Sequence, residues 1–420
     1  MTRDEMLEFV QKVLEKVGVP DAIADLSEDR NAYVRFGQNR LTQNMDTFRR
    51  ELRLWVGDGS RKVEYVSHRI DLEAIPGIVA TAEDLLKSAA PDPEYMPPAE
   101  TGQVYPAIEA FDEATARAEP GPRMEAAAKA IGSAEKADAE ASGIAGMSRS
   151  TTALATSTGN LCFHDETHAN FLLTVHAGGG SSYRSITSTS WGEVPVVASI
   201  DQVVEEALSD RDPMDFPGGE MDVVLEPQAV SDLVPYMLFP LNAKTSDEGI
   251  TVFAGMEGKR VTGENFTLSS TIGGLVPGQP FDSDGLANAD QVWIDRGVLK
   301  TMHCDRFWAR KTGRPAVSSP QCYTVSGSDG TTADLVAKTS RCLRIRRFWY
   351  IRFVDQKSLE LTGMTRDGVF LCENGTCRPV KDFRWNWKPL DLFSRIEALG
   401  TPVRKGFVGA PPMLISRVKV

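Results

Sequence analysis

Two histidines and two carboxylates fall within five positions in the segment His164–His168, which reads HDETH. Imidazole nitrogens and carboxylate oxygens are ligands for Zn²⁺, and a glutamate beside a zinc-bound water can remove its proton. In the H-E-x-x-H motif of zinc peptidases the segment is helical and the glutamate directly follows the first histidine. Here the glutamate comes one position later, so the motif is not matched.

The segments on both sides of this group are apolar and indicate strands. On a strand His164, Glu166 and His168 share one face, which makes a metal site geometrically conceivable. His176 could join them only if a hairpin register brings it across. Because the sequence supplies no other ligand nearby, we expect a polar hairpin tip between two strands and no metal at these four residues.

A basic and aromatic run, Arg341–Arg352, alternates as a strand does. One face would carry Leu343, Ile345, Arg347, Trp349, Ile351 and Phe353, and the other Arg344, Arg346, Phe348, Tyr350 and Arg352. Single-stranded nucleic acid stacks on such runs, but 58 acidic against 46 basic residues give a net charge of -12, which repels polyphosphate. We therefore expect no nucleic acid here and predict that Arg346, Tyr350 and Arg352 bind a peptide, with the arginines pairing to carboxylates.

Two cysteines flank a two-residue turn signal in Cys372-Glu-Asn-Gly-Thr-Cys377. If Asn374 and Gly375 form the turn, Cys372 lies directly opposite Cys377, with Cα atoms about 4.5 Å apart. That spacing admits a disulfide. A pair of thiols is the alternative that a cytoplasmic protein favours.

The composition of the 420 residues limits the compartment. No apolar run approaches the roughly 18 residues of a membrane-spanning helix, so we expect no membrane association. Six cysteines in a long chain, with no basic and apolar leader at Met1–Gly18, favour the cytoplasm.

The elements that must position these groups divide into two sets. Thr2 and Glu5 form a capping-box pattern before an apolar helix, and period-two segments follow. Arg211–Gly219 is rich in proline and glycine without apolar periodicity and predicts a boundary. Beyond it a buried strand, Asp222–Leu225, leads into a helix, Pro227–Leu238. We predict an α+β fold of two domains, residues 1–212 and 220–420, both rich in antiparallel sheet with flanking helices.

The segment Leu361–Gly375, LTGMTRDGVFLCENG, is the most specific part of the chain. We predict two strands joined by a turn at Thr362–Gly368, and then a hairpin at Asn374-Gly375. With the flanking segments Phe348–Val354 and Pro379–Arg384, it closely resembles the C-terminal half of the TldD/PmbA family, in particular its TldE (PmbA) branch.

The resemblance continues to the start of the chain, where Tyr33–Gly37 and Arg40–Asn44 are typical of the family, and reaches to about Pro411. The family is also called modulator of DNA gyrase. Because the chain is acidic, we do not take this name to mean that it binds DNA.

The catalytic branch of this family carries a zinc helix, H-E-x-x-x-H, after the strand that Val223 begins. Counting from Val223, its three motif positions fall at about Pro235, Tyr236 and Pro240. None of these residues can bind zinc or remove a proton from zinc-bound water. The catalytic branch also has a cysteine ligand near residues 403–406, where this chain has none. The resemblance therefore implies no catalytic residue and no zinc in this chain.

By this resemblance the chain is a TldE-like subunit that dimerises with a TldD-like subunit, or with itself. The TldD-like partner would carry the zinc, and the pair would cleave small or unfolded peptides. Two alternatives stay open. One is a self-sufficient metallopeptidase, for which His164, Glu166, His168 and His176 are the only cluster on offer. The other is a non-proteolytic regulator of a target such as gyrase.

Overall fold

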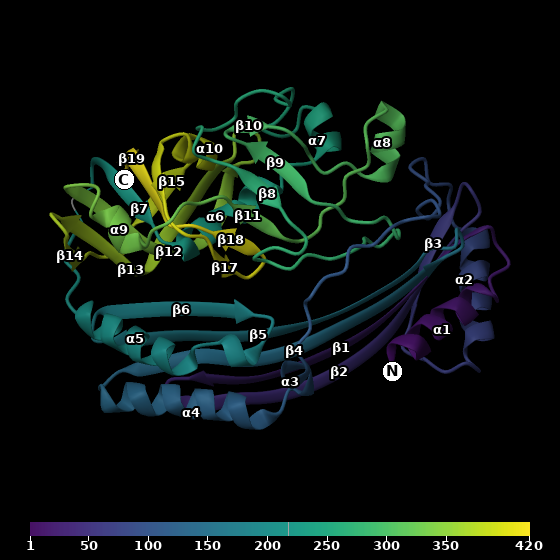
Figure 1. The fold of residues 1–420 in the computed structure, drawn as a ribbon, viewed down its shortest axis with the longest axis horizontal. Coiled ribbons are helices and arrows are strands. Elements are labelled where there is room, and N and C mark those ends of the chain that lie inside the picture. The colour runs from purple at the N-terminus through teal and green to yellow at the C-terminus, as the bar shows by residue number, and fades with distance from the viewer. Residues whose placement is uncertain (217) are drawn as a thin grey trace.

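The first half of the chain builds one long sheet, and the second half builds two more (Figure 1). The computed structural model describes residues 1–216 and 218–420, so Pro217, in the predicted boundary segment, lies outside the described residues. Neighbouring strands are antiparallel except where β12 meets β7 and β11 meets β18. The predicted α+β class, rich in antiparallel sheet, is confirmed.

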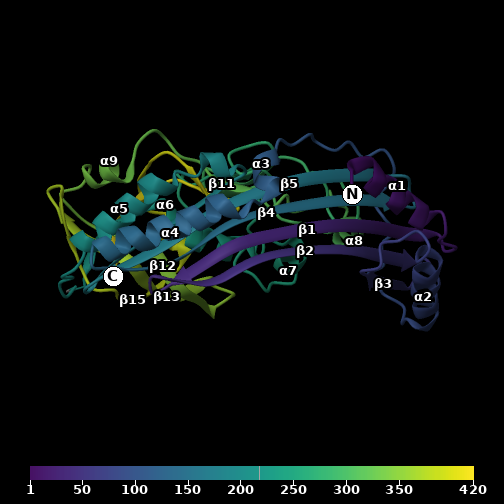
Figure 2. The same ribbon diagram turned by 90° about the horizontal axis from the view of Figure 1, so that it is seen from below.

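The N-terminal sheet has the strand order β3-β2-β1-β4-β5-β6. Its strands are β1 (Asp21–Gly37), β2 (Arg40–Gly57), β3 (Lys62–Ser67), β4 (Glu140–Thr156), β5 (Leu161–Ala177) and β6 (Gly180–Ser188). Four of them, β1, β2, β4 and β5, are 17 or 18 residues long, which makes the sheet an elongated platform (Figure 2).

Helices cover one face of this platform. They are α1 (Arg3–Leu14), α2 (Ile75–Ser88), α3 (Glu113–Arg117), α4 (Pro120–Lys136), α5 (Val196–Ser209) and the short 3₁₀ turn η1 (Trp191–Glu193). The predicted capping box of Thr2 and Glu5 starts α1. Leu26 of β1 packs in the cluster with α1 and α2, and Val34 in the cluster with α4 and α5. Since these positions share strand parity, all four helices lie on one face, and the other faces the C-terminal half.

The C-terminal half contains two sheets with short helices around them. The first sheet comprises β10 (Val298–Leu299), β9 (Gln291–Asp295), β8 (Leu268–Ser270), β11 (Tyr323–Val325), β18 (Val408–Ala410) and β17 (Val403–Lys405). The second comprises β14 (Thr376–Pro379), β13 (Glu360–Glu373), β12 (Arg341–Asp355), β7 (Glu220–Leu225), β19 (Met413–Lys419) and β16 (Ile396–Leu399), with β15 (Arg384–Trp387) paired to β13. The helices are α6 (Pro227–Leu238), α7 (Ala243–Asp247), α8 (Arg306–Thr312), α9 (Thr332–Val336) and α10 (Pro389–Phe393).

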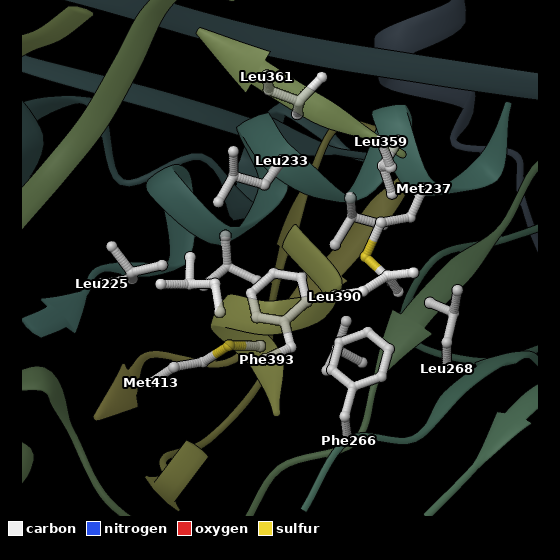
Figure 3. Close-up of a cluster of buried hydrophobic side chains, with 14 of the residues drawn as sticks. Leu225, Leu233, Met237, Phe266, Leu268, Leu359, Leu361, Leu390, Phe393 and Met413 are labelled. Carbon is white, nitrogen blue, oxygen red and sulfur yellow. The ribbon is translucent and has the colours of Figure 1, made fainter. Parts of the chain in front are cut away.

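The predicted strand-to-helix unit, now β7 and α6, is confirmed and lies in the main core (Figure 3). Leu233 and Met237 of α6 pack into a cluster with side chains of both C-terminal sheets, and Phe266 stacks on Phe393 with ring centroids 4.9 Å apart. The inner face of α6 is therefore fixed in the core. Only its outer face and its C-terminal end remain available to contact a ligand.

The β13 hairpin differs in one respect from the prediction. The turn expected at Thr362–Gly368 is wrong, because this segment runs inside β13, and Asp367 and Gly368 (φ 55° and 128°) mark an irregularity in the ladder. The chain instead turns at residues 356–359. The hairpin at Asn374-Gly375 is confirmed, with both residues at positive φ.

Cys372 lies opposite Cys377 in this hairpin, as predicted, with Cα atoms 3.9 Å apart. The two sulfur atoms form a disulfide bond. The pair of thiols that a cytoplasmic protein favours is therefore not the state that the structure shows.

Among the helices of the described residues, none has the length and apolar character needed to cross a bilayer.

Candidate functional site

The face of β5 that looks toward the C-terminal half carries the predicted row of His164, Glu166 and His168. The prediction that the three residues share one face is confirmed. The prediction that they form a hairpin tip is wrong, because they lie inside a single strand of 17 residues. Glu166 Oε2 is 3.6 Å from His164 Nε2 and 3.5 Å from His168 Nε2. Burial raises the pKa of Glu166, but the two imidazoles lower it more, to about 2.

His176 does not join this row. It lies eight residues beyond His168 on the same strand, about 26 Å away at 3.3 Å per residue, and pairs with Glu140 and Ser181. The group that approaches His168 is instead Arg404 of β17, with Nη2 3.4 Å from Nδ1. Within residues 1–216 and 218–420 no three His, Cys, Asp or Glu side chains are arranged to hold a metal ion.

A cavity of about 200 Å³ adjoins this row, between the N-terminal sheet and the loop 279–283. Asp25 of β1 lines it with His164, Glu166 and Asp282. Burial raises the pKa of Asp25 to about 6, against the weaker lowering effect of Arg53, and burial likewise raises that of Asp282 to about 6. The Oδ1 atom of Asp25 is buried without a hydrogen-bond partner among the described residues. Ionised Asp25 is therefore costly to the fold.

Replacing Asp25 with asparagine is expected to raise the free energy of unfolding at pH 8 by about 3 kcal/mol, since a pKa raised by roughly two units costs about 1.4 kcal/mol per unit. The raised pKa means that the folded state binds the proton more tightly. Protonation of Asp25 therefore stabilises the folded state. This contribution is fully present below about pH 4 and is lost as the pH rises through about 6. Urea titrations at pH 8 and pH 4.5 measure the difference, with exposed Asp201→Asn as control. An equal gain at both pH values would contradict this account.

The two-sided pattern predicted for β12 is wrong between its two register shifts, at residues 347–350, and holds again from Ile351, which packs in the same core cluster as Leu343 and Ile345. The register of β12 against β13 shifts between Ile345 and Arg347 and again between Trp349 and Arg352. Each shift moves the following side chains to the other face of the sheet. Phe348 consequently packs in the core, Arg347 is buried, and Trp349 is 48% exposed.

Arg346, predicted to bind peptide, is buried between the two halves of the chain. Its guanidinium lies 3.3 Å from Glu206 and 3.6 Å from Asp210, both from the segment of α5, and it donates to Ser182 Oγ at 3.0 Å. A fourth contact is the carbonyl oxygen of Asp367 at 2.8 Å. With 5% of its side chain exposed, Arg346 connects the N-terminal sheet to β12 and presents nothing to a peptide outside.

Tyr350 and Arg352, the other two predicted peptide-binding residues, remain on the surface. Tyr350 is 64% exposed, at φ 56°, and the Arg352 guanidinium lies over its ring, 4.3 Å from the centroid. Phe353 contacts Tyr236 and Phe239 at the end of α6, with centroids 5.3 and 5.8 Å apart. Phe239 itself is 64% exposed. We call this surface, made of Phe239, Tyr350, Arg352 and Phe353, the aromatic rim.

The positions that the zinc helix would use lie on the last turn of α6 and just beyond it. Pro235 is inside the helix, Pro240 is buried, and the Tyr236 hydroxyl donates to the carbonyl oxygen of Ile351 at 3.0 Å. Two prolines have no side-chain ligand atom, and the tyrosine hydroxyl is already used. These residues do not fit a zinc ion, and they support no step through one.

Two buried charged groups beside α6 were missed from the sequence. Asp232 accepts hydrogen bonds from the Phe348 N–H and Gln228 Nε2 at 2.8 and 2.9 Å, and burial raises its pKa to about 6. Lys405 donates to the carbonyl oxygen of Ser185 at 2.8 Å, and burial lowers its pKa to about 8. Neither group had a signal in the sequence, because Asp232 lies outside the apolar stripe of α6 and has the pattern of an ordinary solvent-facing carboxylate, and nothing marked Lys405.

Comparisons with solved structures show a shared fold. TldE from Thermococcus kodakarensis superposes with a TM-score of 0.89 at 15% identity over 99% of both chains. A candidate modulator of DNA gyrase from Thermotoga maritima gives 0.86 at 17% over 100% of both chains, and one from Bacteroides thetaiotaomicron gives 0.85 at 18% over 99% of this chain and 98% of that one. None of the curated proteins matches this chain.

The family comparison concerns the C-terminal half. Residues 218–420 match the model of the PmbA/TldA metallopeptidase C-terminal domain, the part that contains α6, β12 and the aromatic rim. Residues 218–420 therefore belong to the PmbA/TldA metallopeptidase C-terminal domain family, and the chain as a whole has the fold of the TldE and gyrase-modulator structures.

Proposed function

We propose that this chain is the non-catalytic, TldE-like subunit of a zinc peptidase whose metal is held by a TldD-like partner. The observation that carries the proposal is the end of α6, because the positions of the family's zinc motif, counted from Val223, fall at about Pro235, Tyr236 and Pro240. No cysteine follows Cys377 to serve as the distal ligand. A chain that keeps the family fold without the metal ligands can still shape the chamber and bind the substrate.

The aromatic rim supports the substrate-binding part of the proposal. It combines exposed rings with the Arg352 guanidinium directly beside the end of α6. Aromatic and arginine side chains are the types that contribute most to binding at protein interfaces. We propose that small or unfolded peptides lie across this rim, and that the assembled pair works in the cytoplasm.

The test is metal content and peptide cleavage, measured on this chain alone, on a TldD-like partner and on their mixture. We expect no bound zinc in this chain, and cleavage of casein peptides by the mixture that EDTA abolishes. A partner with its zinc-helix glutamate replaced by glutamine should bind this chain and leave the mixture inactive.

The alternatives predict other results. One zinc per chain with EDTA-sensitive cleavage by this chain alone would establish a self-sufficient peptidase and point to His164, Glu166 and His168. A phenotype of this chain that survives the partner's glutamate substitution would favour a non-proteolytic regulator, as the gyrase-modulator names of two structural neighbours suggest.

A further inference from the structure

A pocket of about 220 Å³ opens at the C-terminal end of α6, next to Pro240. Its apolar walls are Leu238, Phe239, Leu241 and the indole of Trp293 on β9. The indole N–H is already bound to Ser270 Oγ at 2.9 Å, so Trp293 offers only apolar surface. Ligand pockets for drug-sized molecules are usually about 300–1,000 Å³. This smaller pocket suits a single side chain.

One polar group in the pocket is the imidazole of His303. Its position is fixed by the backbone, because His303 N–H donates to the Leu241 carbonyl and the Ala243 N–H donates to that of His303, at 2.9 and 2.8 Å. Asn242 Oδ1 accepts from the Thr245 N–H, so the amide nitrogen of Asn242 is the atom that faces His303 Nδ1 at 3.4 Å. Burial lowers the pKa of His303 and keeps it neutral. With Nδ1 as acceptor, the ring proton is on Nε2, which is free to donate.

Two hydroxyl groups complete the polar set. Ser319 Oγ and the Tyr323 hydroxyl are 2.5 Å apart and hydrogen-bonded to each other. Burial raises the pKa of Tyr323, so it stays a neutral phenol. The pocket therefore combines apolar walls with the His303 imidazole, the Asn242 amide that faces it and a hydroxyl pair, and no Lys, Arg, Asp or Glu lines it in the described part of the chain.

We propose that this pocket binds a tyrosine side chain of the peptide substrate. The identity of the ligand as a peptide rests on the proposed function. The aromatic ring fills the apolar walls, the phenol oxygen accepts from His303 Nε2, and the phenol proton goes to the hydroxyl pair of Ser319 and Tyr323. Charged side chains are excluded, because burial without a counter-ion is costly. Phenylalanine fits but leaves the His303 Nε2–H without an acceptor, while the Ser319 and Tyr323 hydroxyls stay paired with each other.

The position of the pocket agrees with this assignment. Phe239, which lines it, also belongs to the aromatic rim through its contact with Phe353. A peptide lying across the rim could therefore place one side chain into the pocket while its neighbours contact Tyr350 and Arg352.

The test is calorimetric titration of the full chain with N-acetyl-L-tyrosinamide, N-acetyl-L-phenylalaninamide and N-acetyl-L-lysinamide. We expect the tyrosine amide to bind about 10-fold more tightly than the phenylalanine amide, a ratio typical of one buried hydrogen-bonded group. The lysine amide should show no binding. Ser319→Ala and His303→Phe should each reduce the tyrosine preference to less than about 3-fold. Ser209→Ala, an exposed serine at the end of α5, should leave it unchanged.

The readout is a ratio of two affinities on the same protein, so a variant that is merely less stable does not imitate the result. Equal binding of the tyrosine and phenylalanine amides, binding of the lysine amide, or an unchanged ratio in Ser319→Ala would each overturn the proposal. Because these titrations use the chain alone, they are independent of the zinc and cleavage measurements. Failure of the pocket and failure of the subunit assignment can therefore be told apart.

Discussion

Replacing Arg346 with methionine is expected to lower the free energy of unfolding by about 3 kcal/mol, because buried Asp210 loses its nearest cation and Glu206 keeps only Arg184, at 3.8 Å. Glu206, 3.3 Å from the guanidinium, is the partner whose pKa is held down by Arg346 against burial. Asp210 is a weaker partner, since burial raises its pKa to about 6 despite Arg346. Methionine keeps the apolar volume of the side chain but supplies none of the four polar contacts. Urea titration at pH 7 measures the loss.

Arg341→Met is the matched control for this experiment. Arg341 is on the same strand and is paired with Glu373 at 3.2 Å, but both side chains are about half exposed. Exposed pairs of this kind contribute about 0–1 kcal/mol. A different result would contradict this structural role. If Arg346→Met had the unfolding free energy of the wild type, but its mixture with the TldD-like partner no longer cleaved peptides, Arg346 would bind substrate, as predicted from the sequence.

Local signals in the sequence predicted the structure well wherever a few adjacent residues decide the outcome. The strand and helix at Asp222–Leu225 and Pro227–Leu238 follow from apolar periodicity and were found with almost the same bounds. The face shared by His164, Glu166 and His168 follows from strand parity. In the Asn374-Gly375 hairpin, the turn residues alone set Cys372 opposite Cys377.

What the sequence could not show depends on residues far apart in the chain. Alternation along β12 placed Arg346 on the face of Arg344, and both guanidinium groups do lie over the Phe370 ring, but α5 and β6 of the N-terminal half cover that face at Arg346. The register shifts against β13, which bring Phe348 into the core, have no marker in β12 itself. The partners of Arg346 are about 140 residues away, at Glu206 and Asp210. Arg404, which approaches His168, is 236 residues away. Such contacts arise only when the halves of the chain pack together.

The double variant Tyr350→Ala/Arg352→Ala is expected to lower kcat/KM of the assembled pair on peptides about 10-fold or more, without lowering the stability of this chain by more than about 1 kcal/mol. Both side chains are exposed, so their loss leaves no cavity and no buried charge. Tyr350 is held at φ 56° on a register shift, a conformation that costs a non-glycine residue energy and often marks a binding site. Its ring lies under the Arg352 guanidinium, which also donates from Nη1 to the Ile351 carbonyl oxygen at 2.8 Å, and these two contacts hold the exposed arginine in place to pair with a peptide carboxylate.

The measurement is initial-rate kinetics on casein peptides with saturating TldD-like partner, next to a thermal unfolding curve of each variant alone. Arg378→Ala on β14 is the control, since it removes an exposed arginine elsewhere on the same sheet and should leave kcat/KM unchanged. The substrate role predicts a rise in KM that the control does not share, because the rim binds the peptide and does not touch the reacting carbonyl. If both variants changed kcat/KM equally, the rim would act only through net charge. If neither did, the peptide would bind elsewhere in the chamber.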